Sequence, residues 1–362
     1  MKFGTNKLRI TGMLAMGMVA GAAHAQSSVT LYGVADAALR YLTGANKNDD
    51  SQFSLANGAI SQSRWGLRGR EDLGGGMYAQ FKLESGFNLP NGASSSSGVL
   101  FNRYASVGIG STTYGLLSFG QQNNPTYEFL IDGWDPLTVG NYLQNEWVPV
   151  AFSNTLHGGN NMAMYTYTRG QLIARAAYSF GGVAGSFSTG SLRSVAFAYG
   201  PAPFGIQAGY VQSENASNLR QTSYNVQLRY QYTGAEFFLG YYNSNDQTGS
   251  VEAFLTGSAP SPSTSNPRKD NAMVLGATYA ATPKIKFSFA GYYDWASNVL
   301  GKPGDAGDGR RYTLVGLAEY YFSNRTSVYA TVDYNRMSGA TRIEAPNGTD
   351  QLGVALGLRT RF

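Results

Sequence analysis

Apolar and polar side chains alternate strictly along several strand-length stretches of this 362-residue chain. In the clearest stretch, 224–232, every second residue from Tyr224 onward is apolar or aromatic, and the residues between them are polar. A period of two places alternate side chains on opposite faces of a β-strand. The same pattern recurs at 77–84, 284–295 and 351–362. We therefore expect an all-β fold whose strands have one apolar and one polar face.

Short and long connections alternate between these stretches, which is the second strong pattern of the sequence. We expect short turns at 72–75, 111–114, 169–170, 201–203, 233–234, 281–283 and 322–325, and longer polar loops at 44–58, 90–98, 122–160, 182–191, 215–222, 246–270, 297–310 and 337–350. Tight turns at one end and long loops at the other are typical of a transmembrane β-barrel. Seven turns and eight loops predict a barrel of 16 antiparallel strands.

Closure of this sheet follows from the membrane environment. The sequence after residue 26 contains no apolar run long enough for a membrane-spanning helix. In lipid, an open sheet edge leaves backbone groups without hydrogen-bond partners, so a spanning sheet must close. At about 16 strands the side chains no longer fill the barrel, and an aqueous channel remains. Aromatic residues near the expected strand ends are predicted to form interfacial girdles: Tyr41, Trp65, Tyr178, Tyr210, Tyr241, Trp295 and Tyr334.

The first 25 residues have the pattern of a secretory signal peptide. A positively charged start, with Lys2, Lys7 and Arg9, precedes a short apolar run, and a small-x-small cleavage motif ends at Ala25. We expect cleavage after this residue. The mature chain is then a single barrel domain, 26–362.

Composition disfavours most catalytic and metal chemistry. The chain has no cysteine, which excludes zinc–thiolate sites and cysteine nucleophiles, and only His157 of its two histidines lies outside the signal peptide. We therefore expect no catalytic residue, no metal and no cofactor. Three of the 27 basic residues and none of the 22 acidic residues belong to the signal peptide. The mature chain is thus nearly neutral, and no basic run remains to bind nucleic acid.

Five segments and the last residue carry a family resemblance. They are 28–36 (SVTLYGVAD), 63–76 (SRWGLRGREDLGGG), 81–87 (FKLESGF), 101–108 (FNRYASVG), 117–122 (LSFGQQ) and the terminal Phe362. Together they resemble Gram-negative trimeric general porins of the beta-proteobacterial branch. The resemblance implies an outer-membrane homotrimer of 16-stranded barrels, each with an inward-folded constriction loop. The partners that it implies are outer-membrane lipid, lipopolysaccharide, and the small hydrophilic solutes and ions that permeate.

The constriction loop implied by the resemblance is 122–160, the longest connection, and it departs from the family pattern. It is rich in aromatic residues, with Trp134 and Trp147 among them, together with Tyr127, Tyr142 and Phe152. The segment that follows, 157–161, lacks the arginine that the family pattern has where the chain re-enters the wall.

The parity of a strand residue, meaning its odd or even position, decides which face of the sheet its side chain occupies. Basic residues of one parity predict a charged wall inside the pore. Arg64, Arg68 and Arg70 alternate with Trp65 and Leu67 on one strand. Three arginines facing lipid would be costly, so we expect them to face the lumen. Lys82 and Arg103 extend this wall, although Arg103 shares its parity with Ala105 and Val107; Arg175 and Arg229 are further lumen candidates.

Acidic residues of the long loop are the expected counterparts of this wall: Glu128, Asp132, Asp135 and Glu146. Opposed charges would orient a permeating dipole, with a weak lean towards anions. The alternative is that these charges pair with one another and brace the loop.

The sequence therefore predicts passive diffusion of ions and small hydrophilic solutes through a water-filled channel. Two other functions remain open. The loop aromatics would suit a solute-specific channel for sugars or aromatic acids, and a plugged lumen would make the barrel structural or adhesive. Saturable block by one solute class identifies the first, and an absence of stepwise conductance identifies the second.

Overall fold

The computed structural model describes residues 28–138, 140–142, 144, 147–148, 151–152, 158–302 and 305–362. The signal peptide that we expect at 1–25, together with Glu146 and His157, lies outside these residues. No helix in the described part of the chain is long and apolar enough to cross a membrane.

Strands dominate the structure. They are β1 (Ser28–Leu42), β2 (Gln52–Asn57), β3 (Arg64–Gly74), β4 (Met77–Gly86), β5 (Tyr104–Ser111), β6 (Gly115–Asn123), β7 (Gly158–Arg169), β8 (Leu172–Ser179), β9 (Leu192–Tyr199), β10 (Phe204–Glu214), β11 (Arg220–Tyr232), β12 (Ala235–Asp246), β13 (Arg268–Thr282), β14 (Ile285–Lys302), β15 (Asp305–Tyr321), β16 (Thr326–Gly339) and β17 (Asp350–Arg361). The short helices are α1 (Pro125–Phe129), η1 (Leu130–Trp134), α3 (Ser250–Thr256) and η2 (Ala340–Glu344).

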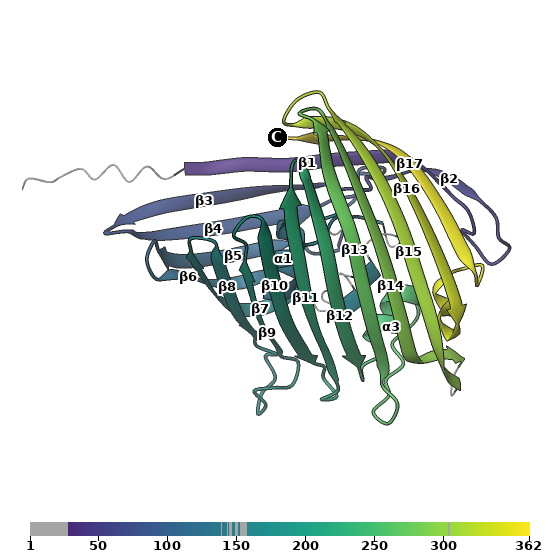
Figure 1. Ribbon diagram of the computed structural model, residues 1–362. Helices are drawn as coiled ribbons and strands as arrows, with labels where there is room; N and C mark the ends of the chain where they lie inside the picture. Colours follow the sequence, from purple (N-terminus) through teal and green to yellow (C-terminus); the bar gives the residue numbers. More distant parts are fainter. Residues whose placement is uncertain are drawn as a thin grey trace, which may run out of the picture.

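The strands form one closed antiparallel barrel. From β3 to β17 each strand pairs with the next, and β17 pairs with β1 from Val34↔Arg361 to Leu42↔Gly353. β2 and β3 share one position, because β2 pairs with the second half of β1 and β3 with the first half. This arrangement confirms the predicted 16-stranded barrel. In Figure 1, β1, β3 and β4 run almost horizontally whereas β12 to β16 run steeply, as strands on different walls of a tilted barrel do.

Turns and loops follow the predicted rhythm with two differences. Short turns join β3 to β4 and then every second pair of strands, from β5–β6 to β15–β16, and the long connections lie at the other end. The expected loop 44–58 contains β2. Most of the expected loop 297–310 is strand, because β14 and β15 continue their pairing to Lys302↔Asp305 through two bulges. The bulges break the period-two pattern, so this hairpin resembles a loop in the sequence.

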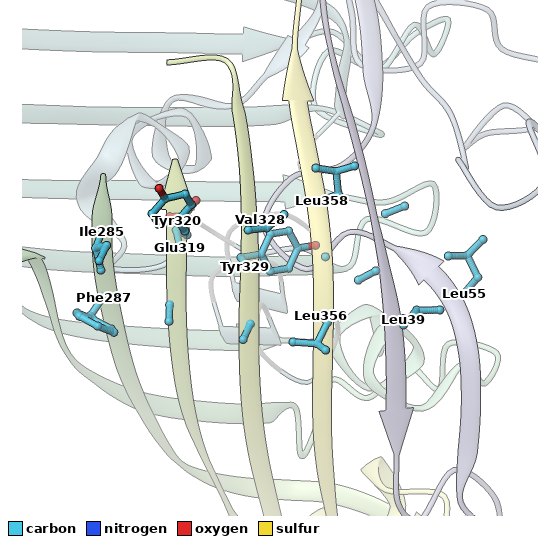
Figure 2. A pocket seen from close by; sticks show the side chains of 15 residues that line it. Leu39, Leu55, Ile285, Phe287, Glu319, Tyr320, Val328, Tyr329, Leu356 and Leu358 are labelled. Atoms are coloured by element: carbon cyan, nitrogen blue, oxygen red, sulfur yellow. The ribbon is translucent and has the colours of Figure 1, made fainter. Parts of the chain in front are cut away.

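Inward and outward faces differ as the alternation predicts. On β11, Asn225 and Gln227 are buried in the barrel interior, whereas Tyr224 and Leu228 are exposed on the outside. The aromatic residues expected at the girdles all share the outward parity. Figure 2 shows the apolar outer face where β14 to β17 meet β1 and β2, with Ile285, Phe287, Leu356, Leu358, Leu39 and Leu55.

An arginine introduced on the outer face tests which residues of that face lie at the centre of the membrane. We predict that Leu239→Arg, midway along β12, lowers the free energy of unfolding in lipid vesicles by about 3 kcal/mol. Asn245→Arg, on the same outward face but at the loop end of the strand, should cost less than about 1 kcal/mol. Denaturant titration followed by tryptophan fluorescence measures both values. Equal losses would contradict the assignment of Leu239 to the lipid-facing band.

Candidate functional site

The long connection between β6 and β7, residues 124–157 and here named loop L3, enters the barrel through a short helix. The Asn124 side chain caps α1 by accepting a hydrogen bond from the Tyr127 backbone N–H at 3.1 Å, and Pro125 occupies its first turn. Asparagine at the cap and proline in the first turn favour a helix start. Gly133 then adopts φ 99°, where only glycine is unstrained, and the chain turns away from the helix.

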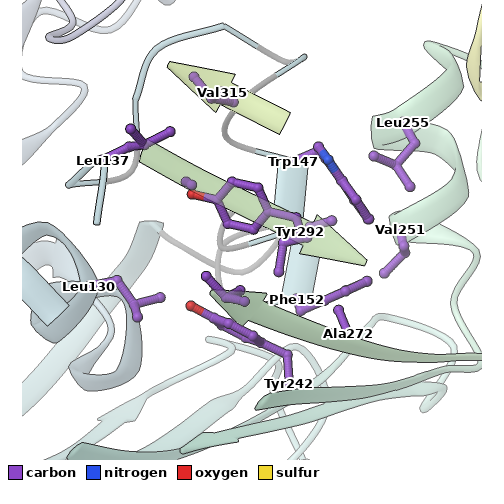
Figure 3. Close-up of a cluster of buried hydrophobic side chains, with 14 residues drawn as sticks. Leu130, Leu137, Trp147, Phe152, Tyr242, Val251, Leu255, Ala272, Tyr292 and Val315 are labelled. Carbon is purple, nitrogen blue, oxygen red and sulfur yellow. The ribbon is translucent and has the colours of Figure 1, made fainter. Parts of the chain in front are cut away.

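L3 packs against one side of the lumen through a large apolar cluster. Trp147 and Phe152 are completely buried, and their ring centroids lie 6.1 Å apart. Their neighbours in the cluster come from L3 itself, from α3 and from β12 to β15: Leu130, Leu137, Val148, Ala151, Val251, Leu255, Tyr242, Ala272, Val274, Ala290, Tyr292 and Val315 (Figure 3). Burial of this apolar surface holds the loop on the wall.

Small residues on the inward face of the barrel make room for L3. A side chain at Gly276 would come within 2.5 Å of Pro136, and one at Gly205 within 2.9 Å of Trp134. Ala196 and Ala198 on β9 pack directly against Phe129 and Trp134. The barrel wall is therefore shaped to fit this loop.

Four wall arginines each stack on one aromatic ring of L3. The guanidinium carbons lie 3.9 to 4.4 Å from the ring centroids, in the pairs Arg40–Tyr142, Arg175–Phe129, Arg229–Trp134 and Arg311–Trp147. A desolvated cation–π contact contributes about 2 kcal/mol. The stacks come from β1, β8, β11 and β15, so they secure the loop around much of the circumference. Burial in this packing raises the pKa of Tyr142 to about 12.

The opposite side of the lumen carries the basic wall, which we define as Arg64, Arg68, Arg70, Lys82 and Arg103. Four of these residues lie on strands: Arg64, Arg68 and Arg70 on β3, and Lys82 on β4. The strand register places all four on the inward face, since Arg68 pairs with Lys82 and Arg64 pairs with Val34. Arg68 and Arg70 stack on Tyr32 and Tyr78, with 5.3 and 3.6 Å between guanidinium carbon and ring centroid.

Glu84 lies at the centre of the basic wall. Its carboxylate is 2.6 Å from Arg103 Nε, 3.8 Å from Arg64 Nε and 4.0 Å from Lys82 Nζ. It also accepts a hydrogen bond of 2.8 Å from the Tyr32 hydroxyl. Glu84 therefore binds three cations together, and its charge offsets only one of them.

Arg103 reaches the wall from outside its strand. It precedes β5, and its side chain turns inward to Glu84 and to Gln62, so the parity of Ala105 and Val107 does not apply to it. Lys82 lies over the Tyr104 ring, 3.2 Å from its centroid. The Tyr104 hydroxyl in turn donates to Glu128 at 2.5 Å.

The acidic residues of L3 have different partners. Glu128 accepts from Tyr104 and lies next to the basic wall. Asp132 forms a 2.8 Å ion pair with Arg175 on β8, on the side of the lumen where L3 is packed. Asp135 is buried and accepts a 3.1 Å hydrogen bond from Tyr292 on β14. Only Glu128 of these three contacts the basic-wall side of the lumen.

Most other lumen arginines are matched by carboxylates. Arg40 makes a bidentate contact with Asp333 at 2.9 and 3.0 Å. Arg359 lies 2.5 Å from Glu319, and Arg229 lies 3.6 Å from Glu236. By contrast, the basic wall holds five cations beside two carboxylates, Glu84 and Glu128, with Asp72 further along at the turn. The excess positive charge of the lumen is therefore concentrated on β3 to β5.

The lumen is filled unevenly. Inward residues under L3, such as Gln227 and Val274, are at most 1% exposed. On the basic wall, the side chains of Arg64 and Lys82 are 28% and 36% exposed. The open part of the lumen thus borders the basic wall. In the described part of the chain, no cluster of three or more acidic or histidine side chains is arranged to hold a metal ion.

A second charged network joins two further loops to the wall beside L3. Arg268 contacts Asp270 at 2.8 Å and Glu344 of η2 at 2.7 Å, and Arg311 contacts Glu344 at 3.3 Å. Glu252 of α3 lies in the same network and accepts from the Leu300 backbone N–H at 3.4 Å. Burial raises the pKa of the Glu252 carboxyl.

Sequence reasoning did not single out Glu84 or the four aromatic-stacking arginines as a set. Glu84 has the inward parity of Lys82, so the alternation contains the signal for it. The stacking partners come from strands far apart in the chain, and parity gives no information about which ring each arginine meets.

Comparison with known proteins agrees with this geometry. A model of the Gram-negative porin family matches residues 12–340. An outer membrane porin protein of Bordetella pertussis is 30% identical over 390 aligned residues, which cover 95% of this chain and 96% of that protein. Outer membrane porin protein 32 of Delftia acidovorans is 35% identical over 174 residues, 46% of this chain and 48% of that protein.

Solved structures show the same fold. The anion-selective porin from Comamonas acidovorans superposes with a TM-score of 0.73 at 22% identity, over 93% of this chain and all (100%) of that one. The trimer form of OmpT from Vibrio cholerae gives 0.63 at 15% identity, over 93% and 99% of the two chains.

The packing of L3 against the barrel wall can be tested at Trp134. We predict that Trp134→Ala weakens docking of the loop by about 3 kcal/mol, because it removes the Arg229 stack and leaves a cavity beside Ala198. The expected result is stronger current noise in single-channel recordings. Trp65→Ala, which removes an outward-facing ring packed on Phe101, is the control. Equal noise in the two variants would show that Trp134 does not hold the loop.

The packing of α3 against the barrel wall should depend on pH. Because burial raises the pKa of Glu252, its neutral form favours the docked state, and that contribution is lost as pH rises through the raised pKa. Glu252→Gln stays neutral, so its thermal midpoint should exceed that of the native protein by an increasing margin at higher pH. Midpoints of both proteins measured across the acidic to neutral range give this difference. A margin independent of pH would contradict the prediction.

Proposed function

Because the chain belongs to the Gram-negative porin family and is therefore an outer-membrane channel protein and not an enzyme, we propose that ions and small hydrophilic solutes diffuse passively along its basic wall. We propose Arg64, Arg68, Arg70, Lys82 and Arg103 as the residues that set a preference for anions. Of the acidic constriction residues, Glu128 lies next to the basic wall, and Asp132 and Asp135 lie on the opposite side.

One observation carries this proposal: cations outnumber carboxylates along the basic wall, whereas the ion-paired arginines elsewhere in the lumen are each matched by at least one carboxylate. Two carboxylates accompany five cations there, and the Arg64 and Lys82 side chains remain accessible to water. Fixed charges lining a narrow aqueous passage raise the local concentration of counter-ions. Anions should therefore outnumber cations in the open part of the lumen.

The partners of the loop carboxylates also support a preference for anions. Asp132 is compensated by Arg175, and Asp135 is buried away from the open lumen. Neither contributes much negative potential next to the basic wall. Glu84 is the residue that limits the anion preference, since it lies among three of the five cations.

A solute-specific channel with a sliding surface of aromatic rings is less well supported. Such a surface needs rings that face the open lumen. Trp147 and Phe152 are fully buried, and Trp134 is only 5% exposed. These rings hold the loop in place, which favours diffusion without a dedicated solute site.

The remaining features of the mature protein are proposals of the same kind. We propose removal of residues 1–25 as a signal peptide, and a mature domain of 26–362. A homotrimer is supported by the Vibrio cholerae OmpT structure, which is described as a trimer form. The apolar outer face would then contact lipid, lipopolysaccharide or a neighbouring subunit.

Reversal potentials in a salt gradient test the basic wall. Changing Arg64 and Arg68 together to Ser should widen the passage and shift the reversal potential towards cation preference. Glu84→Gln should shift it the other way, because one compensating charge is lost. Planar-bilayer recordings give both values.

Arg193→Gln is the matched control, since Arg193 is exposed on the outward face of β9 and its loss should leave the potential unchanged. An unaltered reversal potential in the double arginine variant would remove these residues from the constriction. If the native protein produced no stepwise conductance, the channel proposal itself would fail.

A further inference from the structure

The chain leaves the barrel wall between β2 and β3. Residues 58–63 connect these two strands, and they lie opposite only two residues of β1, Ala35 and Asp36. Because a regular strand pair has equal numbers of residues on both sides, the extra residues must leave the sheet. They turn into the lumen, where Ser61 and Gln62 remain partly exposed. We name residues 58–63 the inward segment.

Asp36 of β1 anchors the inward segment to the lumen side of the wall. Its fully buried carboxylate accepts hydrogen bonds from the Ser61 backbone N–H at 2.9 Å and from the Tyr329 hydroxyl of β16 at 2.7 Å. The Tyr329 oxygen accepts in turn from the Ala59 backbone N–H at 2.8 Å. A side chain at Gly58 would overlap the Asp36 carboxylate. Directional contacts at close approach therefore fix the path of the segment.

The part of L3 around Asn141 is joined to the same segment. The Asn141 backbone N–H donates to the Ala59 carbonyl at 2.8 Å, and its side-chain amide donates to the Gly58 carbonyl at 2.7 Å. Tyr142 belongs to one apolar cluster with Ala59 and Ile60. The inward segment thus lies between L3 and the wall of β1 and β16, and it forms part of the boundary of the constriction.

Gln62, at the other end of the inward segment, contacts two cations of the basic wall. Its backbone carbonyl accepts a hydrogen bond from Arg64 Nη1 at 3.1 Å, and its side-chain Oε1 accepts one from Arg103 Nη1. Both guanidinium groups also lie beside the Glu84 carboxylate, at 3.8 and 2.6 Å. Arg103 is therefore held from two sides, by Glu84 through Nε and by Gln62 through Nη1.

An amide at position 62 orders these cations without neutralising them. The positive charges of Arg64 and Arg103 lie close enough to repel each other. A guanidinium whose second donor is free tends to close on a carboxylate in a bidentate contact, which here would be Glu84. The two oxygens of Gln62 occupy a donor of each arginine and carry no charge. The wall therefore keeps its excess positive charge while both cations stay in fixed positions.

The Gln62 side chain takes no part in anchoring the inward segment. In the described part of the chain, its hydrogen bond goes to Arg103, whereas the contacts to β1, β16 and L3 come from other residues of the segment. Removal of this side chain should therefore leave the segment and the barrel in place.

We propose that Gln62 is a positioning residue for the ion preference of the channel: the inward segment places it beside Arg64 and Arg103, where its uncharged acceptors hold both guanidinium groups at the open lumen. This inference deepens the proposed function and rests on it, because it requires that the basic wall set the ion preference. The contacts of Asp36, Tyr329 and Asn141 act indirectly, by fixing where Gln62 lies.

Reversal potentials of single and double variants test this role. Gln62→Ala (Q62A) retains the backbone contact with Arg64 and removes only the acceptor for Arg103. We expect Q62A to shift the reversal potential towards cation preference, because Arg103 is then drawn to Glu84. The shift should be smaller than that of Arg103→Met (R103M), which removes the charge itself. In the R103M background, Q62A should cause no further shift, since the residue through which Gln62 acts is gone.

Gln62→Glu separates the position of the acceptor from its charge. The carboxylate keeps an acceptor for Arg103 but adds one negative charge to the wall. The shift of the reversal potential should therefore be about that of R103M, which removes one positive charge. Both changes lower the net charge of the basic wall by the same amount, so they should exceed Q62A alike.

Gln212→Ala is the matched control. Gln212 accepts a hydrogen bond of 2.9 Å from Arg193 Nε on the outward face of the barrel, so this variant breaks an arginine–glutamine contact outside the lumen. Its reversal potential should equal that of the native protein. The thermal midpoint of Q62A should also stay near the native value, and a large fall would overturn the inference, because Gln62 would then hold the segment and not the cations.

Two results of the recordings would contradict the inference. A native reversal potential in Q62A, with R103M shifted, would overturn it and leave the proposed function standing. An equal shift by Q62A in the native and R103M backgrounds would also overturn it, because Gln62 would then act on the ions without Arg103. If neither R103M nor the double arginine variant shifted the potential, the proposed function itself would fail, and this inference with it.

Discussion

Backbone hydrogen bonding is the constraint on which the rest of this structure depends. A strand within lipid has no water to satisfy its N–H and C=O groups, so every strand needs two neighbours. The pairing of β17 with β1 supplies the last of these contacts and turns a sheet into a barrel. Because β2 and β3 share the other side of β1, the ring closes at 16 positions. That size leaves a lumen too wide for the wall side chains alone to fill.

L3 uses much of that space, and its packing decides where the remaining opening lies. The loop buries Trp147 and Phe152 against β12 to β15, and wall arginines stack on its rings. Sites such as Gly276, where a side chain would collide with Pro136, show that wall and loop fit each other closely. The basic wall on β3 to β5 stays accessible because the loop packs elsewhere. Charge and shape therefore act together, since the loop leaves open the side of the lumen that carries excess positive charge.

Much of the fold could be predicted because membrane strands impose a simple rule on every second residue. The inward position of Arg64, Arg68 and Arg70 follows from parity alone, and so does that of Lys82. The rule fails where the strand is interrupted. Arg103 precedes β5 and turns inward against its apparent parity, and the bulged hairpin of β14 and β15 resembles a loop. The partners of Asp132 and Asp135 could not be predicted from the sequence either, because they depend on the path of a loop whose sequence has no periodicity.

The sequence by itself determined the class of fold, the strand count and the side of the wall on which the residues of the regular, unbulged strands lie. These properties are local, since period-two alternation and turn chemistry act over a few residues. Only the tertiary structure decided which residues from distant strands meet: Glu84 with three cations, and arginines of β1, β8, β11 and β15 with the rings of L3. Such contacts arise when the barrel closes and the loop packs into it, and this brings together residues whose separation in the chain carries no repeating signal.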